Sequence, residues 1–383
     1  MTTSRYDRVR QLLINSGARR YRFEQFTRAV FSQGVDHVDQ ITTLPSALRQ
    51  AIAAEIGGSV VALQPDRVER TDQASKVRFR LADGTMIETV QLRYRAGWTS
   101  LCISSQAGCG YGCAFCATAS MGLRRQLSVD EITDQVLWFR HQSGQAGRVA
   151  FMGMGEPLAN AQVIDALDIL LDPALFAYSP RRITVSTVGM RPGLERLLAA
   201  HPDVGITFSL HAAIDTVRRR LVPLEDRFPA VDVLERLDRH IRHTGREVTL
   251  ACALIDGVND RDDDIDALIG LVRDRAAPAW RYHVNLYPLN PSLHIDGDLR
   301  PSRRVRAVHD RLRSAGLRTS IRAQFGTSIA AGCGQLATSN RVALRRPTTW
   351  RAGVTDDIRR RTPSYSGNPT PQRKERPSWR RTC

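Results

Sequence analysis

The chain has 383 residues, of which 42% are hydrophobic and 25% are charged, as is ordinary for a globular protein with a large core. No apolar run approaches the roughly 20 residues that span a bilayer, and the N-terminal segment lacks the apolar stretch of a secretory signal; we therefore expect a soluble, cytoplasmic protein without a membrane partner. The formal net charge of +16 favours a nucleic-acid partner, because cationic surfaces attract polyphosphate.

The first part of the chain predicts a small helical unit followed by a hairpin. Residues 5–17, 20–34 and 44–58 carry apolar side chains at helical spacing, and each segment ends near a glycine. In residues 75–94, two alternating runs flank Asp83-Gly84, which is a strong hairpin signal. We predict a helical accessory domain at residues 1–57, suited to RNA docking through phosphate contacts, and a β-hairpin linker at residues 58–97.

From about residue 98 the pattern alternates between short β-rich runs and helical segments. The predicted strands are residues 100–104, 148–153, 182–187, 205–210, 247–255 and 281–287, and predicted helices lie at 128–142, 162–171, 230–243 and 264–275. Six such β/α units imply parallel strands joined by right-handed crossovers. Six units are fewer than the eight of a TIM barrel, so the sequence predicts an α/β fold: an open, partial (β/α)6 barrel over residues 98–340. Its chemistry should gather at the C-terminal ends of the strands.

Residues 341–383 lose this periodicity and carry twelve Lys or Arg against three Asp or Glu. A segment with so few apolar residues cannot offset the entropy that it would lose on ordering. We predict a disordered basic tail, which either has no specific task or tethers RNA nonspecifically.

Four of the seven cysteines fall within residues 102–116, and three of them have the spacing C-x3-C-x2-C: Cys109, Cys113 and Cys116. Clustered thiols in a reducing compartment favour a metal or catalytic role over disulfides. Three thiolates can hold a [4Fe–4S] cluster and leave one iron open for a non-protein ligand. The spacing, with Phe115 before the last cysteine, resembles the signature of the radical S-adenosylmethionine (SAM) superfamily, whose partial barrel also suits the predicted strands.

The alternative for these three cysteines is a structural zinc site. Such a site normally recruits a fourth Cys or His at a paired spacing, and none is evident nearby. His201 or His211 could be supplied by folding. The sequence therefore favours the iron–sulfur cluster over zinc.

The chain is similar, over about residues 21–338, to a narrower family, the Cfr/RlmN type of radical SAM RNA methyltransferases. The resemblance rests on segments that occur in the family's order: ETV at 88–90, LCISSQAGCGYGCAFCAT at 101–118, VDEITDQV at 129–136, FMGMGEP at 151–157, SPRRITVSTVG at 179–189, FSLHA at 208–212, HVNL at 283–286 and IAAGCGQL at 329–336. Agreement in so many ordered segments makes chance similarity implausible.

The resemblance implies roles for two cysteines outside the cluster motif. Cys333 matches the family's methyl carrier, which holds the methyl group as S-methylcysteine, and Cys102 matches the second catalytic cysteine. From the residues alone, each could instead be a small buried hydrophobe, although Cys333 lies between two glycines, where a packing residue gains little. Glu88 matches a residue assigned as proton acceptor; its alternative is a solvent-facing strand residue.

The resemblance also implies SAM contacts at four strand ends. Single Ser or His residues at strand ends are more often structural, but together on one rim they indicate a pocket. The residues are Gly155, Glu156, Ser186, Ser209, Leu210, His211 and Asn285.

In the mechanism that the resemblance implies, one SAM methylates Cys333 and a second, cleaved reductively at the cluster, yields a radical that activates the S-methyl group. The methylene radical adds to the adenine ring, and Cys102 assists deprotonation and resolution of the adduct. A Cys102–Cys333 disulfide results, so we expect an electron donor such as flavodoxin or ferredoxin and a disulfide reductant as partners.

The family's substrate is an adenosine in the peptidyl-transferase region of 23S rRNA. Cfr-type members methylate carbon 8 and confer resistance to ribosome-directed antibiotics; RlmN-type members methylate carbon 2, and some also modify tRNA. YRAGW, CISSQ and RAQFG favour the Cfr type, Pro157 favours the RlmN type, and Gly332 fits neither. We favour carbon 8, with carbon 2 as the alternative.

The sequence also leaves two hypotheses about other classes of protein. A radical SAM enzyme that does not methylate would have no need of Cys333. A noncatalytic RNA-binding protein would use the cysteine cluster only for structure.

Overall fold

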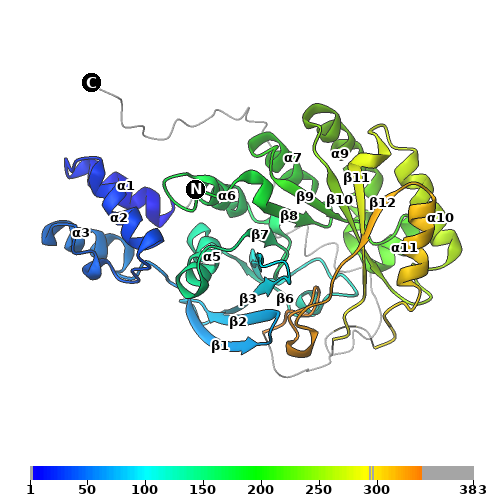
Figure 1. Ribbon diagram of the computed structural model, residues 1–383, viewed down its shortest axis with the longest axis horizontal. Helices are drawn as coiled ribbons and strands as arrows, with labels where there is room; N and C mark the ends of the chain where they lie inside the picture. The colour runs from blue at the N-terminus through cyan, green and yellow to red at the C-terminus, as the bar shows by residue number, and fades with distance from the viewer. Residues whose placement is uncertain (1–2, 293–294, 296, 339–383) are drawn as a thin grey trace.

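The computed structural model describes residues 3–292, 295 and 297–338; the predicted basic tail lies outside them. It confirms the predicted α/β class, with parallel strands in an open barrel (Figure 1). One ten-stranded sheet has the order β1-β2-β3-β4-β7-β8-β9-β10-β11-β12. Its parallel strands are β4 Thr99–Cys102, β7 Arg148–Phe151, β8 Ile183–Thr187, β9 Gly205–Ser209, β10 Val248–Leu254, β11 Tyr282–Pro288 and β12 Arg318–Ile321.

Six of these parallel strands match the six predicted runs, and β12 adds a seventh that pairs with β11. Within the described chain, β12 forms no ladder with β4, so the barrel is open as predicted. The strands pair in parallel because a helix crosses over between most successive pairs. The consequence is that their C-terminal ends meet at one edge of the sheet.

The predicted hairpin is also confirmed, and it is continuous with the barrel. Strands β2 (Ala74–Arg80) and β3 (Met86–Arg93) pair in antiparallel fashion around the Asp83-Gly84 turn, and β1 (Gln64–Arg70) extends the pair. Because β3 also pairs with β4, the hairpin forms the first part of the same sheet. A separate two-stranded sheet joins β5 (Gln106–Cys109) to β6 (Gly122–Gln126).

Local sequence signals mark the ends of some helices. Helix α5 begins at a capping box made by Ser128 and Glu131, and α9 ends at Gly245 in the left-handed conformation. The helices are α1 Arg5–Asn15, α2 Tyr21–Ser32, α3 Ser46–Ile56, α4 Ala117–Ser120, α5 Val129–Ser143, α6 Gln162–Leu171, α7 Arg191–Ala200, α8 Asp215–Leu221, α9 Ala230–Thr244, α10 Asp262–Arg273 and α11 Val305–Ser314. None of the described helices is long and apolar enough to cross a membrane.

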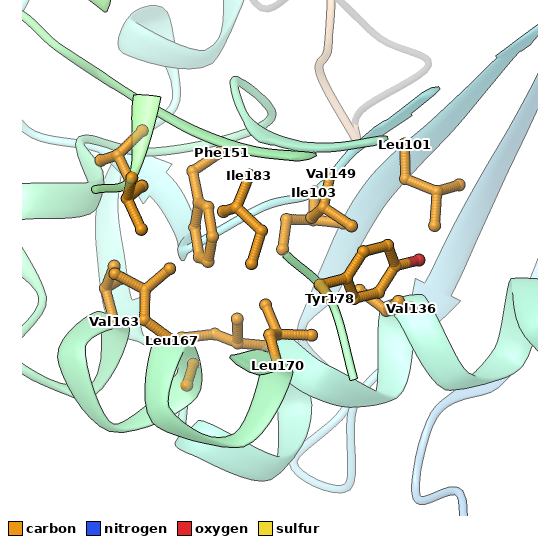
Figure 2. Close-up of a cluster of buried hydrophobic side chains, with 14 of the residues drawn as sticks. Leu101, Ile103, Val136, Val149, Phe151, Val163, Leu167, Leu170, Tyr178 and Ile183 are labelled. Carbon is orange, nitrogen blue, oxygen red and sulfur yellow. The ribbon is translucent and has the colours of Figure 1, made fainter. Parts of the chain in front are cut away.

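The main core lies between the outward face of the sheet and the surrounding helices. Outward residues of β4, β7 and β8 pack against α5 and α6, as Figure 2 shows for Leu101, Val149, Phe151, Leu167 and Leu170. Burial of these side chains supplies the main drive for folding. The packing also fixes the strand ends on which the site is built.

The N-terminal helices α1–α3 lie together at one end of the molecule (Figure 1). Arg5 anchors them: its guanidinium is buried and donates to Asp134 of α5 at 2.8 Å and to the Val60 carbonyl. Tyr6 and Phe31 extend the main core into this unit. The predicted helical unit therefore exists and is fastened to the barrel by a buried ion pair and an aromatic contact.

Candidate active site

A pocket opens at the C-terminal ends of the parallel strands, where the topology predicts chemistry. It has about 980 Å³ of space not filled by protein atoms, including the part open to solvent. The fold thus gathers residues that lie far apart in the sequence. The predicted site residues on its walls are Cys109, Cys113, Cys116, Gly155, Glu156, Ser186, Ser209, His211 and Cys333.

The three clustered cysteines lie on one short loop whose geometry is built locally. Cys109 ends β5, and Cys116 precedes α4 and donates its N–H to the Cys113 carbonyl at 3.2 Å. Gly108 has a φ of 78°, and a Cβ at this position would lie 1.9 Å from the carbonyl oxygen of Gly122 in β6. Glycine is therefore required for β6 to close against the loop.

The thiols of this loop fit an iron–sulfur cluster. Burial raises the pKa of the Cys109 thiol to about 12, and burial also raises the pKa values of Cys113 and Cys116 above the ordinary range. Among the described residues, no three His, Cys, Asp or Glu side chains are placed to hold one metal ion. In a [4Fe–4S] cluster each thiolate binds a different iron, so the donor set fits this group better than zinc. The cluster's positive iron would deprotonate the thiols.

Gly155 and Glu156 form a turn shortly after β7. Gly155 has a φ of 96°, and a Cβ there would lie 2.4 Å from the Cβ of Gln106, so only glycine fits. The Glu156 carboxylate is 4% exposed and accepts the N–H groups of Leu158 at 3.1 Å and Val188 at 2.9 Å. Burial raises its pKa to about 7. A carboxylate held in this way can face a cationic amino group.

Two hydroxyls lie side by side on the next strands. Ser186 of β8 and Ser209 of β9 have their Oγ atoms 3.3 Å apart, and both line the pocket. Leu210 is different: its side chain is fully buried in the main core and does not line the pocket. Any role of Leu210 at the site must pass through its backbone.

His211 lies in a strained conformation at the pocket wall. Its φ is 62°, which a non-glycine residue rarely adopts, and its carbonyl accepts the Asn259 amide at 2.7 Å. The Nδ1 atom accepts the Ala253 N–H at 3.2 Å, so the neutral ring carries its proton on Nε2. Burial lowers the pKa to about 3, with a further contribution from the charge of Arg218. His211 is therefore a neutral hydrogen-bond donor.

Arg218, which sequence reasoning missed, holds the backbone behind these residues. It is fully buried, pairs with Glu225 at 2.8 Å, and donates to the carbonyls of Val188 and Ser209 at 2.9 and 3.3 Å. In a chain with so many arginines, no local signal distinguishes this one. Its role as a brace between two strand ends is visible only in the structure.

The structure separates Asn285 from the cysteine pocket. Asn285 lies within β11, lines a deeper cavity inside the barrel, and its buried Oδ1 has no partner among the described residues. Asn290, beyond the end of β11 at Pro288, lines the cysteine pocket and donates to the Cys333 carbonyl at 2.9 Å. The rule that chemistry gathers at strand ends would have favoured Asn290 over Asn285.

Cys102 and Cys333 line a second, smaller pocket together. Cys102 ends β4, and the loop of Cys333 is held against the cluster loop by the Ala117 N–H, which donates to the Gly334 carbonyl at 2.7 Å. Burial raises the pKa of Cys102 to about 11, while the charge of Arg322 acts in the opposite direction. Arg322 lines both pockets.

Glu88 lies beside this arrangement and lines neither pocket. It is 4% exposed, and Oε2 accepts the Ala337 N–H at 3.0 Å, four residues beyond Cys333. Lys76 lies 3.6 Å from its Oε1 and 3.0 Å from Glu69. Burial raises the pKa of Glu88, and Lys76 acts against this rise. In this structure the carboxylate anchors the backbone that follows Cys333.

Four of the sequence segments that carry the family resemblance are joined by one buried network. Gln135 Oε1 accepts the Thr89 hydroxyl at 2.6 Å and the Ser104 N–H at 2.8 Å. The Ser104 hydroxyl donates to the Glu88 carbonyl at 2.6 Å and accepts the Met154 N–H at 2.9 Å. The network therefore ties β3, β4, α5 and the turn after β7 together beneath the site.

The residues of the site fit a radical SAM centre, and known proteins similar to this chain support the same class. The model of the radical SAM superfamily matches residues 103–269. A solved structure titled as a radical SAM methyltransferase from Sphaerobacter thermophilus superposes with a TM-score of 0.80 at 36% identity, covering 88% of this chain and 99% of that chain. The chain is a member of the radical SAM superfamily.

The relatives named ribosomal RNA large subunit methyltransferase Cfr define its family more narrowly. The protein of that name from Clostridium botulinum is 42% identical over 339 residues, covering 88% of this chain and 98% of the relative. The one from Staphylococcus warneri is 40% identical over 336 residues, covering 87% and 96%. The chain therefore belongs to this family of radical SAM ribosomal RNA methyltransferases, which confirms the resemblance inferred from its motifs.

Proposed function

We propose that this protein methylates carbon 8 of an adenosine in the peptidyl-transferase region of 23S rRNA, with Cys333 as the methyl carrier. The observation that carries the proposal is the position of Cys333. Of the predicted site residues, it alone lines both the pocket of the clustered cysteines and the pocket of Cys102. A group on its Sγ can therefore receive a methyl from one side and deliver carbon to a substrate on the other.

The substrate explains why such a carrier is needed. An adenine ring C–H has no nucleophilic electron pair with which to attack a sulfonium methyl group. The cluster and SAM, when bound, supply the methyl groups and the radical chemistry that overcome this barrier. Cys109, Cys113 and Cys116 would hold the cluster, and the buried Glu156 carboxylate would bind the amino group of SAM.

The other residues of the pocket would position the cofactor and Cys333 and would exclude water. The hydroxyls of Ser186 and Ser209 and the Nε2–H of His211 would hydrogen-bond to the cofactor at successive strand ends. Asn290 fixes the Cys333 backbone through its 2.9 Å hydrogen bond to the carbonyl. Apolar side chains on the pocket wall, among them Phe115, Phe151 and Leu289, would limit the water around reactive groups.

Cys102 would resolve the covalent RNA adduct on Cys333. Its neutral thiol, with a pKa raised to about 11, must lose a proton before its sulfur can bond to that of Cys333. As that bond forms, the sulfur–carbon bond to the RNA breaks and its electron pair stays on the carbon, which takes up a proton and becomes the methyl group. The two cysteines are left as a disulfide. An external thiol reductant must then reduce the disulfide to restore both cysteines. An electron donor such as flavodoxin or ferredoxin must supply electrons to the cluster.

Mass spectrometry of 23S rRNA from cells with and without this protein tests the proposal. We expect one additional methylated adenosine, and fragmentation beside reference nucleosides should identify carbon 8. Methylation at carbon 2 would support the alternative that Pro157 favours, and tRNA from the same cells should be measured in parallel. Unchanged rRNA in both strains would contradict the proposed activity.

A further inference from the structure

The turn between β3 and β4 carries an aromatic pair that the proposed chemistry does not use. The Tyr94 N–H donates to the Trp98 carbonyl at 3.0 Å, and Gly97, with a φ of 85°, closes the turn. The two rings stack with centroids 3.6 Å apart and an interplanar angle of 11°. Trp98 is nevertheless 38% exposed, so part of its ring is accessible to a ligand.

The surroundings of this pair are cationic. The guanidinium of Arg148 lies 5.4 Å from the Trp98 ring centroid, and Arg95 is exposed within the turn itself. Neither arginine, nor Arg322, forms an ion pair with a carboxylate in the described part of the chain. Unpaired arginines beside an exposed aromatic ring suit a phosphate-bearing ligand with a flat base.

Tyr94 also lines a cavity inside the barrel that has about 860 Å³ of space not filled by protein atoms, including the part open to solvent. Five of its eleven lining residues are polar side chains from the inward faces of the strands: Thr184, Thr207, Thr249, Asn285 and Ser320. The Oδ1 of Asn285, which has no hydrogen-bond partner among the described residues, is one of the groups available there. Threonine, serine and asparagine side chains can hydrogen-bond to the edges of a nucleic-acid base.

This cavity adjoins the cysteine pocket. Four residues line both: Met152, Thr207, Ala251 and Arg322. Arg322 also lines the smaller pocket of Cys102 and Cys333. The cavity walls extend from Thr184 and Thr249, near the N-terminal ends of β8 and β10, to Arg322, just past the C-terminal end of β12. Of these pockets, the clustered cysteines line only the one at the C-terminal ends. A cofactor at the C-terminal ends leaves the opposite end of the barrel as the approach for an RNA base.

We propose that Tyr94 and Trp98 form a stacking platform for an unpaired RNA base that flanks the target adenosine. The platform holds the strand at the mouth of the cavity while the target base passes through it toward the pocket of Cys102 and Cys333, which shares Met152, Arg322 and Ala323 with the cavity. Arg148 contacts a neighbouring phosphate. The inference rests on the proposed function, since it assumes that an adenosine of a single-stranded loop is the substrate.

Binding of a 23S rRNA fragment that contains the peptidyl-transferase loop tests the platform. Base–aromatic stacking is worth about 1–3 kcal/mol per base, so Trp98→Leu should weaken binding about 5- to 150-fold, whereas Trp98→Phe should retain most of the affinity. The matched control is Trp280→Leu, because Trp280 is 54% exposed and lies under Arg281 at 4.0 Å but lines none of these pockets. Iron content and thermal melting show whether each variant keeps its fold.

Equal affinities of the Trp98→Leu and Trp280→Leu proteins for the rRNA fragment would overturn the inference of a stacking platform. A test that needs no variant uses fragments with 5-iodouridine at each position that flanks the target, crosslinked by light to the wild-type protein. Crosslinks to Tyr94 or Trp98 support the inference, and crosslinks only to other segments overturn it. Wild-type methylation of the same fragment is measured in parallel, so that failure of the proposed function is seen separately from failure of the platform.

Discussion

The loop of the clustered cysteines and the loop of Cys333 meet at one pocket but are held there in different ways. The first loop is fixed mainly by neighbours in sequence, which are β5, β6 and the turns between Cys109 and Cys116, with one distant hydrogen bond from the Ala114 N–H to the Leu221 carbonyl at 3.0 Å. The second depends on distant partners, which are Ala117, Glu88 and Asn290. The loop that we propose to bind the cluster is therefore largely a local motif, whereas the loop that we propose to carry the methyl group is positioned by tertiary structure.

The largest effect should come from breaking the local loop. Cys113→Ala removes one of the three thiolates of the loop, and the loop holds no further cysteine, so iron binding and methyl transfer should both be lost. Iron analysis and visible absorption after anaerobic reconstitution, with bleaching by dithionite, provide the measurement. Cys252→Ala is a matched control, because Cys252 is buried on β10 in the main core. Full activity of the Cys113→Ala protein would refute the cluster assignment.

The second prediction separates the two cysteines of the smaller pocket. Cys333→Ala should bind SAM but form neither a methylated protein nor an RNA adduct. Cys102→Ala should allow addition to the adenine ring and then stall, because without Cys102 the covalent RNA adduct on Cys333 is not resolved. The trapped species should appear as a nuclease-sensitive shift on a denaturing gel. Normal turnover by Cys102→Ala, or a trap formed by Cys333→Ala, would show that the roles are misassigned.

The third prediction concerns the protonation of Cys102. Its pKa of about 11 lies two units above that of an ordinary thiol at 9.0, so about 100-fold less thiolate is present near neutral pH. Alkylation of Cys102 by iodoacetamide should therefore be slow at pH 8 and rise about tenfold per pH unit until about pH 11. Peptide mass spectrometry follows the reaction, with urea-unfolded protein as the control. A midpoint near that of the unfolded protein would contradict the raised pKa.

The fourth prediction tests the distant anchor of the Cys333 loop. Lys76, one of two lysines in the sequence, is buried beside Glu88, whose carboxylate accepts the Ala337 N–H. A charge-assisted hydrogen bond is worth about 1.5–3 kcal/mol, so Glu88→Gln or Lys76→Met should slow Cys333 methylation by about tenfold or more while iron content stays constant.

A pH–rate profile distinguishes an anchor from a proton acceptor at Glu88. If Glu88 acts only as an anchor, Glu88→Gln should lower the rate without moving the profile. A profile whose acidic limb disappears in Glu88→Gln would support the proton-acceptor role instead. Loss of iron in either variant would contradict the view that the two loops are held independently.

The smallest effect should come from residues 341–383, which lie outside the described structure. Their surplus of nine positive charges, twelve basic against three acidic residues, should act through counterion release. A protein that ends at Asn340 should keep its chemistry but bind RNA more weakly at moderate salt, with a reduced salt slope. An unchanged slope would show that the tail does not contact RNA.

The sequence by itself determined the features that depend on local order. The period of apolar residues predicted the helices and the six strands, Asp83-Gly84 predicted the hairpin, and the C-x3-C-x2-C spacing predicted the cluster loop. These features depend on residues within a few positions of one another, so a local pattern suffices to predict them. The ordered motifs likewise predicted the family that the comparisons bear out.

Only the tertiary structure decided which polar side chains share a pocket. It placed Asn290 at the cysteines and Asn285 in the deeper cavity, and it turned Glu88 toward the backbone beyond Cys333. It also brought Arg322 beside both lone cysteines and joined β12 to the barrel. The physical reason is that strand register and crossover packing set which face each residue presents, and these depend on contacts between segments that are distant in the chain.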